Sequence, residues 1–134
     1  SEILAIDVRA ALGETIDFFA EYEAHLKKYP SFDFAWGRLM RVILESGSSE
    51  RLDWLLAYPR PVPIHVRHAL QCAFFVKKGA LPSAQSALDD YFCTIEGDER
   101  WGWSWSLIVE AVEESNSQAM HSRLQQVLTM IEES

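Results

Sequence analysis

Apolar positions along most of the chain follow the spacing of amphipathic α-helices. In the first segment, residues 1–30, Leu12, Phe19 and Leu26 recur every seven residues and form part of one apolar stripe. Acidic residues run along another side of this segment. Pro30 disfavours helical backbone at the residue before it, so the pattern predicts one long N-terminal helix there.

Six shorter helices, joined by short links, are predicted in the rest of the chain. Glycine and small polar residues stand where these helices would begin and end. Three prolines within residues 59–63 predict an extended connector between two of them. The predicted helices cover residues 31–47, 49–58, 64–79, 81–97, 98–115 and 117–133, and their expected caps and stops are Ser31 or Asp33, Gly47, Gly79, Ser83, Gly97 and Asp98.

Three tryptophans stand at alternate positions in the stretch RWGWSWSLI, which taken alone is typical of a strand. Because a helix advances about 100° per residue, Trp101 and Trp105 would share one helical side, and Trp103 would lie on another. The flanking residues have helical spacing, so we expect a helix with two apolar faces. One face would pack on a partner helix, and the other would face neighbouring helices or an open groove.

The segment 64–79 shows the same two-faced pattern. A narrow polar strip of Arg67, Gln71 and Lys78 separates the two apolar sides. The expected packing side holds Val66, Ala69, Leu70, Ala73 and Phe74, and the second side holds His65, His68, Cys72, Phe75 and Val76.

Length and composition fit one folded domain, residues 1–134. The apolar share of 49% and the charged share of 24% are ordinary for a globular protein. Six glycines and five prolines are too few for a turn-rich β-sandwich, whereas helices need such residues only between elements. We therefore expect an all-α fold of about seven antiparallel helices.

Several residues recur at an interval of 68 positions. Each has a counterpart of similar type in the later part of the chain, and the segment between them has a helix, a glycine and a second helix in the same order. The recurring pairs are Leu39 with Leu107, Gly47 with Ser115, Leu52 with Met120, and Leu56 with Leu124.

This arrangement resembles the tetratricopeptide repeat, a helix–turn–helix unit of about 34 residues. The resemblance spans about residues 33–130, although glycine after the first Leu is missing throughout and the third repeat lacks its turn glycine. It implies three stacked helix pairs over residues 31–134, with an irregular helical bundle as the alternative. The matching residues are Trp36, Leu39, Ile43, Gly47, Leu52 and Leu56, then Leu70, Ala73, Phe74, Gly79, Ala84 and Leu88, then Leu107, Ala111, Ser115, Met120 and Leu124.

In tetratricopeptide proteins the first helices of the repeats line an inner surface that holds peptides. The resemblance implies that such a groove here includes Phe34, Arg41, Leu44, His65, His68, Cys72, Phe75, Val76, Trp105, Val109 and Val112. Trp36, Arg41, Phe75 and Trp105 are the expected hot spots, because Trp and Arg dominate binding energies at interfaces. The alternative is that the first or last helix covers these residues, which would make them core.

Charge excludes one class of partner and favours another. The net charge is −8, with 20 acidic against 12 basic residues, so a phosphate-binding surface for nucleic acid is not expected. A basic protein partner fits this balance, although the charge would also serve solubility alone. Two cysteines make no disulfide framework, and no membrane span or signal peptide is recognisable, so we expect a cytoplasmic protein.

Few residues suggest catalysis or metal binding. His65, His68 and Cys72 stand at helical spacing within reach of one metal ion, and Cys93 or His121 could complete a zinc site. The chain has none of the common nucleotide-binding, hydrolase or metalloprotease motifs, so we expect neither a cofactor nor enzymatic activity.

We therefore predict a protein-binding module that takes a helix or an extended peptide of a basic partner. An adaptor, a chaperone and an inhibitor such as a toxin-neutralising immunity protein all fit this description. A homodimer through the same groove is an alternative, and a small-ligand or metal-binding helical domain that uses His65, His68 and Cys72 is an alternative of a different class.

Overall fold

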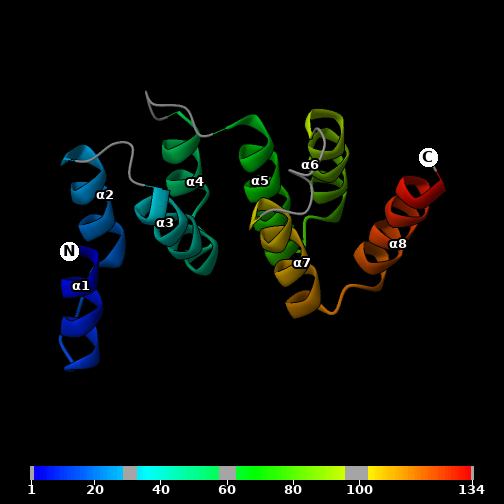
Figure 1. Cartoon of the computed structure of the whole chain (residues 1–134). Coiled ribbons are helices and arrows are strands. Elements are labelled where there is room, and N and C mark those ends of the chain that lie inside the picture. The colour runs from blue at the N-terminus through cyan, green and yellow to red at the C-terminus, as the bar shows by residue number, and fades with distance from the viewer. Residues whose placement is uncertain (1, 29–32, 58–62, 96–102, 134) are drawn as a thin grey trace. The chain divides into compact units, whose positions relative to one another are not determined.

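The described parts of the chain are almost entirely helical in the computed structural model (Figure 1). The structure describes residues 2–28, 33–57, 63–95 and 103–133, and no strand occurs among them, which confirms the predicted all-α class. Eight helices lie within these residues, where seven were expected. They are α1 (Glu2–Ala11), α2 (Phe18–Lys28), α3 (Asp33–Ser46), α4 (Ser49–Leu56), α5 (Ile64–Lys78), α6 (Leu81–Thr94), α7 (Trp103–Ser115) and α8 (Gln118–Glu133).

The extra helix arises because the predicted long N-terminal helix is wrong. Residues 12–17 separate α1 from α2, and Gly13 has a φ of +90°, in the left-handed region that favours glycine. The N–H of Gly13 donates to the carbonyl oxygen of Ala10 at 3.1 Å, and the N–H of Glu14 donates to that of Arg9 at 3.2 Å. These two bonds form a Schellman motif, which ends α1.

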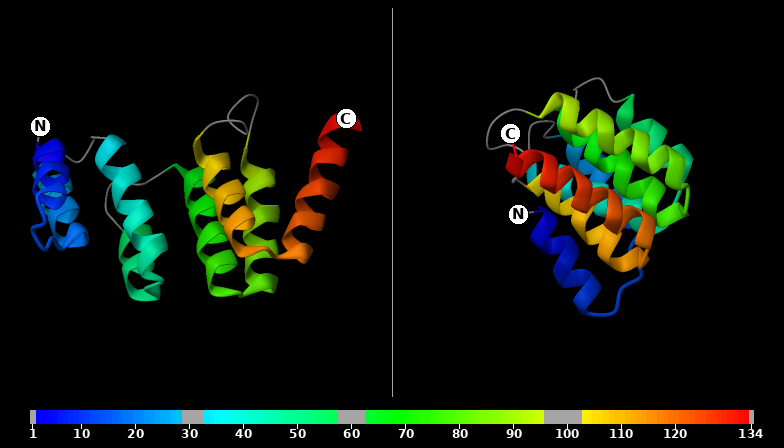
Figure 2. Two further views of the ribbon diagram at one scale, coloured as in Figure 1. Left: turned by 90° about the horizontal axis from the view of Figure 1, so that it is seen from below. Right: turned by 90° about the vertical axis from the view of Figure 1, so that its right-hand side faces the viewer.

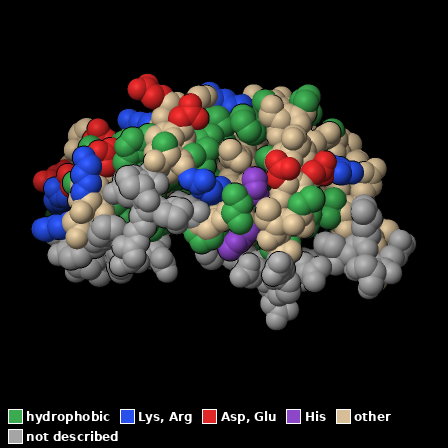
Figure 3. All heavy atoms as spheres, turned by 90° about the horizontal axis from the view of Figure 1, so that it is seen from above, with side chains coloured by type: hydrophobic (Ala, Val, Ile, Leu, Met, Phe, Trp, Pro, Cys, Tyr) green, Lys and Arg blue, Asp and Glu red, His purple; other side chains and the backbone are tan. Residues whose placement is uncertain are grey.

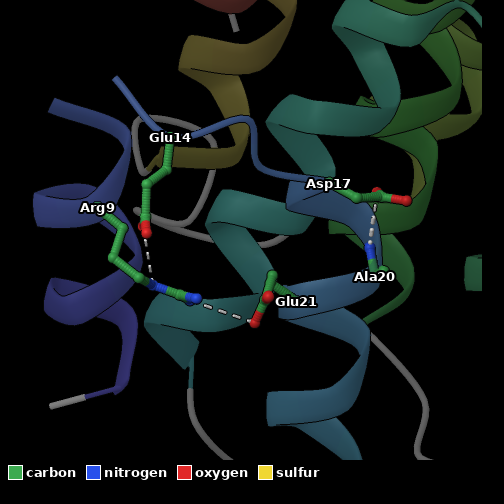
Figure 4. Close-up of polar contacts among 5 residues, drawn as sticks. All are labelled: Arg9, Glu14, Asp17, Ala20 and Glu21. Carbon is green, nitrogen blue, oxygen red and sulfur yellow. Dashed lines mark hydrogen bonds and ion pairs between the residues drawn. The ribbon is translucent and has the colours of Figure 1, made fainter. Parts of the chain in front are cut away.

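Side chains around this turn complete the break (Figure 4). Asp17 Oδ1 accepts a hydrogen bond from the N–H of Ala20 at 3.1 Å and so caps the start of α2. Arg9 lies between two carboxylates, 4.0 Å from Glu14 and 3.5 Å from Glu21. These contacts therefore connect the end of α1 to the start of α2.

The chain forms two compact units, Ser1–Leu55 and Leu56–Ser134, called unit 1 and unit 2 below. In unit 1, the ring of Phe19 in α2 meets that of Trp54 in α4 edge-on at 5.3 Å, and the guanidinium of Arg51 lies 4.4 Å from the centre of the Phe19 ring. The buried apolar side chains of unit 1 are Ile6, Tyr22, Leu26, Trp36, Leu39, Met40, Ile43, Leu44, Leu52 and Leu55.

The central helix of unit 2 is α5, which packs extensively along both α6 and α7 (Figure 2). The helix α8 contacts α6 and α7 at fewer positions. The buried apolar side chains of this unit are Val66, Ala69, Leu70, Cys72, Ala73, Phe74 and Val76 from α5, Ala84, Ala87, Leu88 and Tyr91 from α6, and Leu107, Ile108, Ala111, Val112, Met120 and Val127 from α7 and α8.

Glycine ends α5 as predicted. Gly79 has a φ of +76°, its N–H donates to the carbonyl oxygen of Val76 at 3.1 Å, and the N–H of Ala80 donates to that of Phe75 at 2.9 Å, which again is a Schellman motif. The cap expected at Ser83 is wrong, because α6 begins earlier, at Leu81, with a proline in its first turn. The expected cap Ser31, stop Gly97 and cap Asp98 lie outside the described residues.

The links after α3 and α7 have the same geometry. Gly47 follows α3 with a φ of +65°, and Asn116 follows α7 with a φ of +55°. The serine before each of them donates its hydroxyl to the carbonyl oxygen three residues earlier, at 2.8 Å in both links. The serine after each, Ser48 or Ser117, accepts an N–H bond from the following helix at 3.2 or 3.3 Å.

The interval between these corresponding turns is 69 residues, so the predicted interval of 68 is wrong there. Gly47 corresponds to Asn116 rather than to Ser115, and the helices that follow begin at Ser49 and Gln118, again 69 apart. Asn adopts the left-handed conformation more readily than most residues with a side chain. The turn after α7 therefore contains a residue in the left-handed conformation, as the turn after α3 does, but this residue is Asn116 instead of a glycine.

Candidate protein-binding face

One side of α5 holds exposed and half-buried side chains, although most of the remaining helix is buried. Ile64 is 51% exposed, and Lys78 is also exposed. Four further side chains on this side are half-buried. Because a helix advances about 100° per residue, all six fall within an arc of about 100°. They form what we call the α5 face: Ile64, Arg67, His68, Gln71, Phe75 and Lys78.

Packing on the opposite side holds this face in place. α5 follows the extended residue Pro63 and ends at the left-handed Gly79, so both ends of the helix are defined. Ala69 and Ala73 are fully buried in unit 2, in which α6 and α7 pack along α5. The orientation of the α5 face in unit 2 is therefore set by a close-packed interior.

The charged side chains that α5 contributes to this face are all basic. α5 contains no Asp or Glu, and Arg67 and Lys78 form no ion pair with any carboxylate among the described residues. Arg67 Nη2 donates to the carbonyl oxygen of Leu56, and the buried Nε of Arg67 has no hydrogen-bond partner among the described residues. Lys78 Nζ lies 5.8 Å from the centre of the Phe74 ring.

Two histidines lie at or beside this face. His65 and His68 are both half-buried, and Nδ1 of His68 is a buried atom with no hydrogen-bond partner in the described structure. On the molecular face that Figure 3 shows, histidine side chains lie next to hydrophobic, basic and acidic ones. The histidines therefore lie where apolar and charged side chains meet.

Cys72 and Val76, which were expected in a groove, are buried. Burial raises the pKa of the Cys72 thiol to about 12, so this cysteine stays protonated near neutral pH. A buried, protonated thiol neither lines a groove nor acts as a nucleophile. These two positions lie beside the exposed arc, on the part of α5 that unit 2 buries.

Trp105 packs toward α6. Its ring stacks on Tyr91 at 6.1 Å and meets Phe92 edge-on at 5.5 Å, and the side chain is half-buried. The hydroxyl of Tyr91 also lies 3.0 Å from that of Ser104, in the buried interior. The expected groove residue therefore belongs mainly to a cluster between α6 and α7, while Val109, one turn later, is half-buried.

The other predicted binding residues are dispersed. Trp36 is 9% exposed and contributes to the core of unit 1, and Leu44 and Val112 are buried as well. Arg41 is exposed in unit 1, and the side chain of Phe34 lies outside the described residues. Of the predicted set, the structure places His68 and Phe75 on the α5 face, with His65 at its edge.

Sequence reasoning missed Ile64 and treated Arg67 and Lys78 only as a polar strip. Ile64 opens the helix directly after a proline, where it continues the row that His68 and Phe75 form. The face could have been predicted from the helical positions of these residues, because apolar and basic residues share one arc and the helix contains no acidic residue.

Metal binding finds no support in the arrangement of side chains. Within the part of the chain that the structure describes, no group of three or more His, Cys, Asp and Glu residues is placed to hold a metal ion. Of the expected fourth ligands, Cys93 is exposed on α6, and Nδ1 of His121 lies 2.7 Å from the carbonyl oxygen of Ser117.

Comparison of the chain with known protein families, curated proteins and solved structures finds no match. The resemblance to the tetratricopeptide repeat therefore rests on the residues of this chain alone. None of the helices described here combines the length and the apolar composition that crossing a lipid bilayer requires.

Proposed function

We propose that this protein is a non-enzymatic binding module that takes a helix of another protein on the α5 face. The observation that carries the proposal is the exposure of Ile64, with Phe75 half-exposed three turns later, on a helix whose other side is firmly buried. Large apolar side chains on a preformed helix provide the anchors of a helix–helix interface. An adaptor, a chaperone and an inhibitor, including a toxin-neutralising one, would each use such a face.

The arrangement of α5 and α6 also supports this proposal. The two helices are joined by the turn at Gly79 and pack along each other, as the two helices of a tetratricopeptide repeat do. We propose that they form such a repeat, in which α5 is the first helix and so the one that presents ligand-binding positions. His65, His68 and Phe75 are the predicted groove residues that this helix leaves accessible.

A catalytic role has less support from the described residues. The thiol of Cys72 is buried and protonated, and His65, His68 and Cys72 are not placed to hold a metal ion. A binding role needs only the shape and chemistry of the face, so it is the function that this geometry supports best.

The proposal is tested by placing a charge on the α5 face. Ile64→Asp and wild type, both tagged, are compared in pull-downs from the native cell extract, with bound proteins quantified by mass spectrometry. A partner that wild type captures stoichiometrically should be lost, because an aspartate at this position places a charged group within the apolar contact.

Val8→Asp is the matched control, since Val8 is 58% exposed on α1 and is not part of the face. Both variants should keep the circular dichroism spectrum and the melting temperature of wild type. Retention of the partner by folded Ile64→Asp would show that binding occurs elsewhere and would overturn the proposal.

A further inference from the structure

We infer that the helix that docks on the α5 face is acidic, with carboxylates along one flank of its apolar stripe. This inference rests on the proposed function and adds the chemical class of the partner. It departs from the basic partner that the overall charge of the chain favours, because the local charge of the face has the opposite sign.

The basic residues of this chain differ in whether they form ion pairs. The chain has 20 acidic and 12 basic residues, so its cations have a large choice of internal partners. Lys77, at the end of α5, pairs with Glu114 at 3.1 Å, and Arg123 pairs with Asp89. In contrast, the half-buried Arg67 and the exposed Lys78 form no ion pair with a carboxylate among the described residues, so an acidic ligand would supply one.

The positions of the basic and apolar residues on α5 also match an acidic helix. Arg67 and Lys78 are 11 residues apart, as are Ile64 and Phe75. Eleven residues make about three helical turns, or about 16 Å along the axis, so each pair lies nearly in line. The cations follow one edge of the arc and the apolar pair follows its middle, which is the pattern that an amphipathic helix with one acidic flank would match.

The negative charge of the whole chain does not prevent this contact. At physiological ionic strength, charges separated by more than about 8 Å are largely screened, whereas an ion pair forms within about 4 Å. The charges nearest to the bound helix therefore determine which partner is favoured, and the charged residues of α5 are positive. A basic partner would instead place its cations against Arg67 and Lys78.

The same charges disfavour a second copy of this chain as the occupant. A two-fold dimer through the α5 face would bring the same patch of both copies together. An antiparallel pair of α5 helices would place Arg67 of one copy near Lys78 of the other, and a parallel pair would place each near its own counterpart, with no carboxylate on either copy of α5 to offset them. Like charges opposed in this way destabilise an interface.

Two synthetic helical peptides provide the test. Both have about 18 residues, enough to cover three turns, and the same leucine stripe, but one carries Glu and the other Lys along one flank. Binding to the full chain is measured by fluorescence anisotropy at low and at physiological salt. The Glu peptide should bind about tenfold more tightly than the Lys peptide, with a smaller difference at higher salt.

Variants connect this preference to the face. Lys78→Glu changes an exposed side chain and should reduce the preference several-fold, and adding Arg67→Glu should reverse it. Ile64→Asp should weaken both peptides. Because Arg67 bonds to Leu56, the melting temperature of each variant is compared with that of wild type. Should the double variant not fold, the single variant Lys78→Glu provides the test.

The remaining outcomes separate this inference from the proposed function. Equal binding of both peptides that Ile64→Asp abolishes would overturn the acidic partner while leaving the face as a binding site. Tighter binding of the Lys peptide would also overturn the inference, and so would the absence of binding by both peptides. A dimer in light scattering that Ile64→Asp dissociates would show that a second copy occupies the face, against both proposals.

Discussion

Asp7 and Arg38 join α1 to α3 through two parallel hydrogen bonds. Arg38 Nη1 donates to Asp7 Oδ1 at 3.1 Å, and Arg38 Nη2 donates to Asp7 Oδ2 at 2.7 Å, with both side chains partly buried. The neighbouring Tyr22 is buried, and this burial raises the pKa of its hydroxyl while the positive charge of Arg38 lowers it. The placement of α1 in unit 1 therefore depends on a charged contact as well as on the buried Ile6.

We expect Arg38→Met to lower the free energy of unfolding by about 1–2 kcal/mol, because a two-bonded ion pair is lost and Asp7 is left without its partner. Urea unfolding followed by circular dichroism measures the change. Lys27→Met is the control, since Lys27 pairs with Glu23 in an exposed contact within one helix and should cost less than about 0.5 kcal/mol. Equal losses in the two variants would contradict a structural role for the Asp7–Arg38 pair.

The two left-handed turns predict opposite effects of substitution. Asn116→Gly should raise the free energy of unfolding by about 0.5–1 kcal/mol, because glycine adopts a φ of +55° without steric cost. Gly47→Ala should lower it by about 1 kcal/mol for the same reason. Thermal and urea melts of the full chain measure both.

Gly47→Asn serves as the control for this pair of turns, since it places in the first turn the residue that the second one contains. It should be better tolerated than Gly47→Ala. If alanine and asparagine at position 47 give the same free energy of unfolding, the left-handed conformation does not favour asparagine there, which would contradict the prediction.

The two cysteines should differ in reactivity. Cys93 is exposed, whereas Cys72 is buried and protonated near neutral pH, so a thiol reagent should label Cys93 first and Cys72 only as unit 2 unfolds. Mass spectrometry of the labelled peptides at increasing urea gives the order. Rapid labelling of Cys72 in the native protein would mean that its side of α5 opens to solvent.

Cys72 also predicts a dependence of stability on pH. Its pKa in the folded chain is about 12, above its ordinary value of 9.0, so the folded state holds this proton more tightly than the unfolded state. The resulting contribution is complete below pH 9 and is lost as the pH rises from 9.0 toward about 12. The fall in urea midpoint over this range should be smaller in Cys72→Ala than in wild type.

Trp105 should behave as a structural residue. Its ring packs on Tyr91 and Phe92, so Trp105→Ala should lower the free energy of unfolding by about 2–3 kcal/mol, somewhat less than for a fully buried aromatic residue. Urea unfolding monitored by circular dichroism tests this. If the variant keeps its stability but loses the captured partner, Trp105 belongs to the binding surface instead.

Several elements were predictable because their signals are local. The amphipathic spacing of residues 64–79 and the glycine at its end identified α5, and Gly47 was correctly expected to end α3. The break after α1 was also readable in principle, since Gly13 and Asp17 are a stop and a cap. The seven-residue recurrence hid it: Leu12 continues the stripe of Leu26, yet Leu12 is 78% exposed and Leu26 is fully buried.

The candidate site was less predictable because burial depends on contacts between elements. Periodicity correctly indicated that α5 has two apolar sides, but it could not tell which of them its neighbours cover. The fold buries Cys72 and leaves Phe75, three residues later, half-exposed. Trp105 likewise faces α6 because Tyr91 and Phe92 lie there, and no pattern within residues 98–115 contains that information.

The amino-acid sequence predicts the helical class, several of the helix ends and the residues that are available to pack. These properties follow from side-chain spacing and from the backbone preferences of glycine, proline and the capping residues, which act over a few positions. The accessible arc of α5 with Arg67 and Lys78, beside buried Cys72, arises only from tertiary packing. That outcome depends on how α6, which directly follows α5, and α7, which is more distant in sequence, pack on α5 and which arc of the helix they leave uncovered.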